Sequence, residues 1–421
     1  MRYRKFTTII IIIISIVSLL LVGCTGSSKN LMEDISKNAI PTTSELSLDE
    51  IAVKQTDFAL RLFNACRVSD EKEKNTLVSP LSVLMALSMA ANGADGDTLD
   101  EMEKTLGMTK DELNDLSYTY MEMLSLRNPK FGKLSLANSI WFTDDKRFTV
   151  NQSFLQTNKD YYEGDIYKAP FDKTTLDDIN QWVKDKTDGM IPSILNDIPS
   201  EAVMYLVNAL AFDAEWTEPY LEIQVKDGIF TTEDGKKETK SFLCGEENTF
   251  IEDENSVGFI KYYKGCKYGF AAILPNEDIS IDDYLDSVDG THIYQMLTNK
   301  KNLILSTAIP KFKTEYSSEM SGQLKNMGIK QAFDINKADF RNLGTSTAGN
   351  IFIKDVFHKT FISVDEKGTK AGAATVIALE DGALFLSEPK EIFLDRPFIY
   401  MLIDCETNSP IFIGVMRDLE L

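Results

Sequence analysis

Three segments of the chain have apolar residues at the spacing of helices that bury one face: residues 51–66, 80–92 and 175–187. The second segment is apolar almost throughout, which predicts a helix buried on all sides. Ser79 precedes it as a potential N-cap, and Pro80 occupies the first helical position, where a missing N–H is tolerated. We therefore expect at least three helices that pack on a core.

Other segments are short, apolar and rich in β-branched or aromatic residues, which indicates strands. Strands and helices do not alternate regularly, so an α+β fold is favoured over a doubly wound sheet. From residue 48 onward no Gly/Ser linker, repeat or charge block divides the chain, which predicts one large domain over residues 48–421. The strand-like segments are 135–142, 202–212, 269–274, 303–309, 360–364, 398–403 and 410–416.

The amino terminus has the pattern of an export signal. A basic start is followed by an apolar run over residues 9–22, whose 14 residues would rise about 21 Å as a helix, short of a membrane's ~30 Å hydrocarbon core. The run ends in Leu-Val-Gly-Cys, which resembles a bacterial lipobox. We predict a lipoprotein signal peptide over residues 1–23 and lipidation of Cys24. An uncleaved anchor with an incidental cysteine is the alternative.

Residues 24–47 are rich in Ser, Thr and Asn, which predicts a flexible tether. With the export signal, this predicts an exported protein held at the cell surface or membrane through Cys24, or shed from it.

Composition excludes several function classes. The 421 residues carry 44 basic and 65 acidic side chains, a net charge of −21, which disfavours nucleic-acid binding. Two histidines and five cysteines without Cys-x-x-Cys spacing make a metal or redox centre improbable. Neither G-x-S-x-G nor H-E-x-x-H occurs. We expect no metal, no cofactor and no catalytic residues, so the protein is not expected to be an enzyme.

Several motifs resemble those of serpins. Residues 392–402 (IFLDRPFIYML) and 409–414 (SPIFIG) resemble the family's signature and closing strands, and 356–359 with 364–369 resemble the strand leading into its reactive-centre loop. Shorter matches occur at 75–82, 206–209, Trp216 with Pro219, and 310–312. The resemblance implies a single domain with three β-sheets, about eight or nine helices and an exposed reactive-centre loop near residues 366–391.

The resemblance also implies a function. A serpin is a suicide inhibitor: a serine protease attacks the loop and forms an acyl-enzyme. The cleaved loop then enters the central sheet and traps the protease covalently. We therefore expect a monomeric inhibitor of serine endopeptidases, with cysteine proteases as further targets.

The residues between the hinge and the bait fit strand insertion. If residues 369–379 form a strand, alternate side chains on one face are uncharged and mostly small. Lys370 stands where the family often has Glu, but the alternation points it to solvent. An ordinary Ala-rich strand or helix is the alternative. The residues matching the hinge are Glu366, Gly368, Thr369, Ala371, Gly372, Ala373, Ala374 and Thr375.

The sequence leaves two alternatives for the position of the scissile bond. Counting forward from Glu366 at the family's spacing gives Gly382-Ala383, whereas counting back from Pro397 gives Leu386-Ser387. Gly is a poor bait residue, so Leu384, Phe385 and Leu386 are preferred. These side chains suit elastase-, chymotrypsin- or subtilisin-like proteases.

Other positions match structural controls of the family. Ser79, Ser82, Asn208 and His358 match the shutter, a hydrogen-bonded polar set below the strands that open. Trp216 matches the breach, where the loop first enters the sheet; ordinary core packing is its alternative. The remaining cysteines are expected to be free thiols on separate elements: Cys66, Cys244, Cys266 and Cys405.

Two other functions compete. A non-inhibitory serpin-fold binding protein would be favoured by bulky or charged hinge residues, which this hinge lacks. A solute-binding lipoprotein would fit the export signal and predicts two lobes with a ligand cleft. The carboxyl-terminal motifs do not support the latter.

Overall fold

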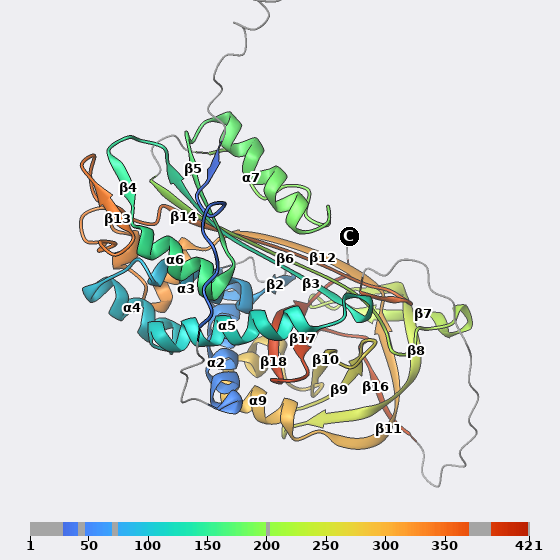
Figure 1. The fold of residues 1–421 in the computed structure, drawn as a ribbon. Coiled ribbons are helices and arrows are strands. Elements are labelled where there is room, and N and C mark those ends of the chain that lie inside the picture. The colour runs from blue at the N-terminus through green and yellow to red at the C-terminus, as the bar shows by residue number, and fades with distance from the viewer. Residues whose placement is uncertain (1–27, 41–46, 70–74, 199–202, 370–388, 420–421) are drawn as a thin grey trace, which may run out of the picture.

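The structure is a computed structural model that describes residues 28–40, 47–69, 75–198, 203–369 and 389–419. Within these residues nine α-helices surround three sheets, in agreement with the predicted α+β class (Figure 1). No described helix is both long enough and apolar enough to cross a membrane. The helices are α2 (Leu48–Ser69), α3 (Pro80–Ala91), α4 (Gly96–Leu106), α5 (Lys110–Leu126), α6 (Gln152–Tyr162), α7 (Lys173–Lys186), α8 (Ile281–Ser287), α9 (Gly290–Thr298) and α10 (Ser321–Met327).

A seven-stranded sheet forms the centre of the molecule, with strand order β1-β5-β3-β6-β15-β14-β12. Its strands come from both halves of the chain, so it can form only after distant segments meet. They are β1 (Lys29–Asn30), β3 (Lys133–Thr143), β5 (Asp165–Ala169), β6 (Met204–Glu215), β12 (Phe312–Glu319), β14 (Asp355–Val364) and β15 (Gly368–Thr369).

A nine-stranded sheet has the order β16-β11-β8-β9-β10-β17-β18-β2, with β7 paired to β8. The long strand β8 pairs β7 along its first part and β9 at its end, so it connects these two strands within one sheet. The third sheet is the pair β4 (Phe148–Val150) and β13 (Gly344–Ser346). The large sheet contains β2 (Thr76–Val78), β7 (Val225–Thr231), β8 (Lys237–Glu252), β9 (Ser256–Tyr262), β10 (Tyr268–Pro275), β11 (Lys301–Pro310), β16 (Lys390–Phe393), β17 (Phe398–Asp404) and β18 (Ser409–Met416).

The elements predicted from apolar spacing are all present, with ends that differ by a few residues. The start of α3 is as predicted, because Ser79 caps it by accepting from the N–H of Ser82 and Pro80 stands at its first position. Every residue of α3 is buried. This helix therefore lies between the two large sheets, where an apolar helix is most stable.

Both faces of the central sheet carry apolar clusters. One face packs on the main core, which includes α2 and α3. The other carries a second cluster in which Trp182 of α7 meets Trp141 of β3, with ring centroids 6.5 Å apart. Figure 1 shows α7 lying across this face. The middle strands of the sheet are therefore covered on both faces, whereas alternate side chains of the edge strand β12 are exposed.

The prediction of a flexible tether over residues 24–47 is wrong for part of that segment. Residues 28–40 of the segment 24–47 lie against the domain instead of apart from it. Lys29 and Asn30 form β1, which pairs β5 at the edge of the central sheet, and Met32 is 2% exposed. The apolar residue and the edge pairing both stabilise attachment, which composition alone does not reveal.

Candidate functional site: the opening between β6 and β14

Two neighbouring strands of the central sheet are paired along only part of their length. β6 and β14 run parallel and pair from Tyr205 and Asp355 to Leu210 and Thr360. Beyond these residues β15 lies between them, pairing Thr369 with Ala214 of β6 and Val364 of β14. The two strands therefore form a wedge, and the chain leaving β14 already occupies its open end.

The side chain of Thr369 is fully buried in this wedge. Its Oγ1 lies 2.6 Å from the hydroxyl of Tyr263, which is also fully buried. The Tyr263 ring stacks on Trp216, with centroids 4.3 Å apart. Gly368 passes so close to β6 that a Cβ there would meet the Ala214 carbonyl oxygen at 2.0 Å. The first hinge residues are therefore fitted into the sheet by specific contacts.

A tight turn carries the chain from β14 into the wedge. The Asp365 carboxylate accepts the N–H groups of Lys367 (2.8 Å) and Gly368 (3.2 Å). Trp216 holds the same turn, because its indole N–H donates to the carbonyl of Asp365 (2.9 Å) and its backbone N–H donates to that of Lys367 (2.8 Å). The predicted breach residue thus lies where the chain enters the sheet.

Glu366 stands on the outer side of this turn. Its carboxylate pairs with Lys311 at 2.6 Å, and this hydrogen bond with Lys311 is the main cause that holds the pKa of Glu366 below its usual range. Both side chains are about one-third exposed, so the pair contributes little to stability. The ion pair links the turn to Lys311, the residue that precedes β12.

The predicted boundaries of the exposed loop need correction. We expected it over residues 366–391, but Gly368 and Thr369 are buried in β15, and residues 390–391 belong to β16. Tertiary partners that are distant in sequence cause both differences. The remaining hinge and bait candidates lie outside the described residues, as does Cys24: Ala371, Gly372, Ala373, Ala374, Thr375, Gly382, Ala383, Leu384, Phe385, Leu386 and Ser387.

The four predicted shutter residues lie together below the paired part of β6 and β14. The backbone N–H of Ser79 donates to Nε2 of His358 (3.0 Å), and the Asn208 amide donates to the carbonyl of Phe357 (3.0 Å). Oδ1 of Asn208 is hydrogen-bonded to Nδ1 of His358, and Oγ of Ser82 lies 3.5 Å from the same Oδ1. These contacts tie β6 to β14 and both strands to α3.

The tautomer of His358 follows from its partners. Nε2 accepts a backbone N–H, so the proton must be on Nδ1, which donates to Oδ1 of Asn208. Complete burial of the ring lowers the pKa of His358 to about 3. The imidazole is therefore neutral at physiological pH.

Sequence reasoning missed three contributors to this region. Asn138 of β3 lies beside the shutter, with its amide 3.3 Å from Oγ of Ser82. Its signal was available, because it is a polar residue inside an apolar strand, as Asn208 is. Asp365 precedes Gly368 by three residues, a spacing at which an Asp carboxylate often accepts the backbone N–H groups of a turn. Tyr263 gave no local signal, since its role depends on Thr369.

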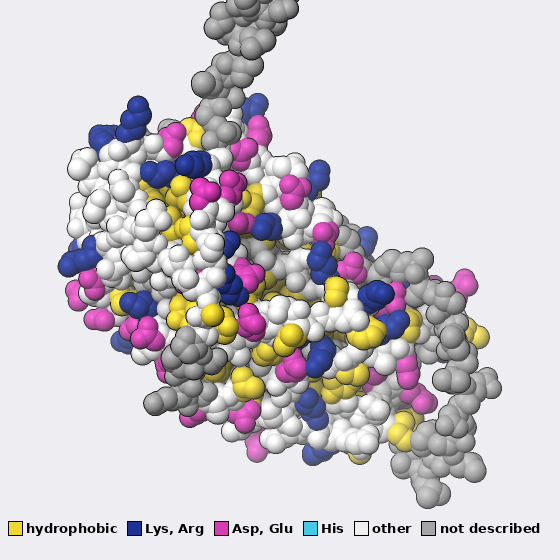
Figure 2. Space-filling view, viewed as in Figure 1, with side chains coloured by type: hydrophobic (Ala, Val, Ile, Leu, Met, Phe, Trp, Pro, Cys, Tyr) yellow, Lys and Arg dark blue, Asp and Glu magenta, His cyan; other side chains and the backbone are white. Residues whose placement is uncertain are grey.

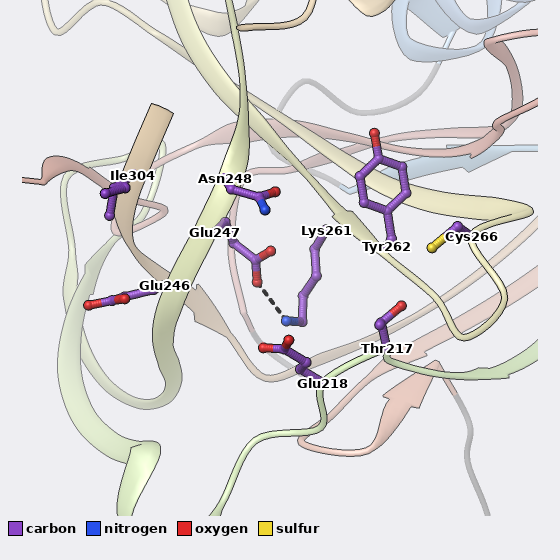
Figure 3. A pocket seen from close by; sticks show the side chains of 9 residues that line it. All are labelled: Thr217, Glu218, Glu246, Glu247, Asn248, Lys261, Tyr262, Cys266 and Ile304. Atoms are coloured by element: carbon purple, nitrogen blue, oxygen red, sulfur yellow. Dashed lines mark hydrogen bonds and ion pairs between the residues drawn. The ribbon is translucent and has the colours of Figure 1, made fainter. Parts of the chain in front are cut away.

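A cavity of about 490 Å³ lies beside the breach, next to Thr217 and Glu218 (Figure 3). Within it Lys261 pairs with Glu247 at 2.6 Å, and both side chains are almost fully buried. Burial raises the pKa of Glu247 despite this cation. Lys261 also lies 5.5 Å from the centroid of the Trp216 ring. The cavity's cation is therefore already used in supporting the breach.

Cys244, Cys266 and Cys405 are free thiols in the structure, and Cys66 is buried in the core. They are less separated than we expected, since the N–H of Cys405 donates to the carbonyl of Lys267, the residue after Cys266. Among the described residues no group of three or more His, Cys, Asp or Glu side chains is placed to hold a metal ion.

Comparison with known proteins gives a consistent result. The family model described as "Serpin (serine protease inhibitor)" matches residues 53–419. An uncharacterised serpin-like protein of Thermococcus kodakarensis is 28% identical over 97% of this chain and 98% of its own length. The leukocyte elastase inhibitor of Equus caballus is 27% identical over 87% of this chain and 99% of its own.

Solved structures agree. The thermophilic serpin tengpin in its native state superposes with a TM-score of 0.88 at 44% identity, covering 93% of this chain and 100% of that one. The same protein in its latent state gives a TM-score of 0.77 at 42% identity, covering 91% and 100%. The present structure is thus more similar to the native form. With the wedge, the shutter and a family match over residues 53–419, the chain belongs to the serpin family.

Proposed function

We propose that this chain inhibits serine endopeptidases by inserting its cleaved reactive loop between β6 and β14. Serpins are in general protease inhibitors rather than enzymes. The observation that supports the mechanism here is β15, because Gly368 and Thr369 already occupy the wedge between these strands. Insertion would then lengthen the existing strand β15, so no new strand would have to be nucleated.

The sequence of the loop supports a large gain on insertion. About ten further ladder residues, at a net ~1 kcal/mol for each hydrogen bond, would supply on the order of ten kcal/mol. This is comparable with the stability of a whole domain. Small uncharged side chains at alternate positions after Thr369 allow burial without unpaired charge.

The bait is proposed to suit proteases that prefer apolar side chains. Leu384, Phe385 and Leu386 are the preferred primary positions, and one relative is named an elastase inhibitor. We propose elastase-, chymotrypsin- and subtilisin-like enzymes as targets, with cysteine proteases as further candidates. A monomer is proposed, since the sheet supplies its own inserted strand.

The test is a denaturing gel of the protein incubated with a panel of these proteases. We expect a denaturation-resistant band at the summed mass of the protease and the cleaved inhibitor. Sequencing of the released peptide should show a start between Phe385 and Ser387, with Ala383 next in preference. Cleavage without such a band, across the panel, would favour a non-inhibitory protein.

Export and lipidation are a separate proposal. The basic start, the apolar run over residues 9–22 and the following Cys24 support processing to a membrane-attached lipoprotein. Cys24→Ala should release the protein from the membrane fraction or leave it unprocessed. If the variant fractionates and migrates like the wild type, this proposal is wrong.

A further inference from the structure

Two cysteines lie at neighbouring turns of the nine-stranded sheet. Cys266 is in the turn between β9 and β10, and Cys405 directly follows β17. β10 and β17 are antiparallel, with Tyr268 opposite Asp404. One step further along this pair, the backbone N–H of Cys405 donates to the carbonyl of Lys267 at 3.0 Å. Cys266 is therefore one residue away from the position directly opposite Cys405.

This placement meets the backbone requirement for a disulfide between the two cysteines. Opposite residues of a hydrogen-bonded antiparallel pair have Cα atoms ~5.5 Å apart, and an offset of one residue gives a diagonal separation of roughly 6–7 Å. Disulfides usually join Cα atoms that are about 4.4–6.8 Å apart. The two backbones can thus be bridged without a large movement of either turn.

The two side chains also lie on the same face of the sheet. The sulfur of Cys405 lies 3.4 Å from the position that a Cβ on Gly269 would occupy. Gly269 pairs with Tyr262 of β9, and Tyr262 lines the same cavity as Cys266 (Figure 3). A regular strand would point Cys266 and its neighbour to opposite faces, but Cys266 has a φ of 53°, outside the strand region. Its side chain is therefore on the face that carries the sulfur of Cys405.

The two thiols differ in accessibility. Cys266 is exposed, whereas Cys405 is partly buried, and burial raises the pKa of Cys405 to about 12. The thiolate is the form that attacks a disulfide, and the attack requires access to solvent. Cys266 is therefore expected to react first with an oxidant, and Cys405 to react second.

From this placement we propose that Cys266 and Cys405 form an intramolecular disulfide when the protein meets a low-molecular-weight disulfide such as oxidised glutathione. Cys266, as the thiolate, attacks one sulfur of the oxidant and forms a mixed disulfide, and the released glutathione takes up the proton that Cys266 lost. Cys405 then loses its proton, attacks the sulfur of Cys266 and displaces the second glutathione, which takes up that proton. Two protein thiols are oxidised, and one glutathione disulfide is reduced to two thiols.

The surroundings of the turn favour this bond over a cross-link between two copies. The turn lies near the end of α5, since a Cβ on Gly265 would meet Phe131 at 2.9 Å. Figure 2 shows apolar side chains scattered among acidic and basic ones around α5. A mixed surface of this kind does not favour self-association, and the net charge of −21 repels a second copy.

The disulfide would link two turns that are 139 positions apart in sequence, residues 266 and 405. A cross-link restricts the unfolded chain, and it does so most when it closes a long loop. It would also hold the β9–β10 turn, where the N–H of Cys266 donates to the carbonyl of Tyr263 at 2.9 Å. We therefore expect the oxidised protein to melt above the reduced protein. This expectation does not depend on protease inhibition.

The test is oxidation of the full chain by oxidised glutathione, followed by mass spectrometry of the intact protein and of its unreduced peptides. We expect the intact mass to fall by about 2 Da, the two hydrogen atoms lost on disulfide formation. A cross-linked pair of peptides containing Cys266 and Cys405 should appear. An unchanged mass, a lasting glutathione adduct on Cys266 or a disulfide-linked dimer would each overturn the proposal.

Variants separate this pair from the other thiols. Cys405→Ser removes the second thiol, so oxidation should leave a glutathione adduct on Cys266 and should not raise the melting temperature. Cys244→Ser, at a partly buried position of β8, is the matched control and should oxidise like the wild type. If Cys405→Ser does not fold, Cys266→Ser at the exposed turn should also abolish the rise. An equal rise in either of these variants and in the wild type would contradict the assignment.

Discussion

The hydroxyl of Tyr263 lies 2.6 Å from Oγ1 of Thr369, and both residues are fully buried. The start of the hinge is therefore part of the central sheet before any protease acts. Insertion of the following residues would lengthen β15 downward, as β6 and β14 separate. The bonds that must break on the way are those of the shutter, above all the one between Asn208 and His358.

Gly368→Ala should displace β15 from the wedge. The added Cβ would meet the Ala214 carbonyl oxygen at 2.0 Å and the Cα of Glu215 at 2.8 Å, both backbone atoms of β6 that cannot rotate away. We expect a lower melting temperature of the intact protein by calorimetry. The matched control is Gly322→Ala in α10, where a Cβ has no neighbour within 4 Å. An equal melting temperature for Gly368→Ala and the wild type would show that β15 does not contribute.

Thr369→Arg should convert the inhibitor toward a substrate. A long charged side chain would be buried beside Tyr263 without a partner, which is unfavourable by several kcal/mol. Insertion should slow, so more protease should escape by hydrolysis. The ratio of inhibitor consumed to protease trapped should rise several-fold. Thr369→Ser keeps the hydroxyl and should stay near the wild-type ratio; a similar rise in both variants would argue against a buried position.

Acid should weaken the native state through His358. Its pKa is about 3 when folded against an ordinary value of 6.5, so only the unfolded chain binds a proton between these values. The stabilisation by the neutral ring is fully present above pH 6.5 and is lost progressively as the pH falls toward 3. Denaturant titrations from pH 7 to pH 4 should show this loss.

Substitution separates this effect from those of other groups. His358→Gln should lower stability at pH 7 and flatten its dependence on pH between 6.5 and 4. His292→Gln changes the only other histidine, which lies at the surface, and should leave most of the dependence in place. A pH dependence that is identical in His358→Gln and the wild type would exclude His358 as its source.

Met32→Ala should destabilise the protein although it lies outside the helices and strands. Met32 is 2% exposed, and truncation of a buried Met costs about 2–5 kcal/mol. Asp34→Ala, two residues away and exposed, is the control. Thermal unfolding of the two variants should differ clearly; equal stability would mean that the amino-terminal segment is not attached in solution.

Local signals in the sequence predicted some features and not others. Ser79 and Pro80 predict the start of α3, because an N-cap and a first-turn proline stabilise the helix that directly follows them in the sequence. Asn208 and His358 are 150 positions apart, so only the family resemblance brought them together. Asn138 was missed because one polar residue in an apolar strand does not show its partner.

The wedge could not be predicted because it is a property of strand order. β15 is two residues long, and it is held by Trp216 and Tyr263 from other parts of the chain. The attachment of residues 28–40 depends in the same way on β5 and the core. Tertiary contacts decide such short segments, whereas spacing and composition decide the long ones.

The most direct test of the account compares the thermal unfolding of intact protein with that of protein cleaved in the loop. If the cleaved loop extends β15 between β6 and β14, the sheet gains a full strand of hydrogen bonds and apolar contacts. The cleaved protein should then melt far above the intact protein, and Thr369→Arg should reduce this difference. A cleaved protein that melts at or below the temperature of the intact one would contradict insertion between β6 and β14.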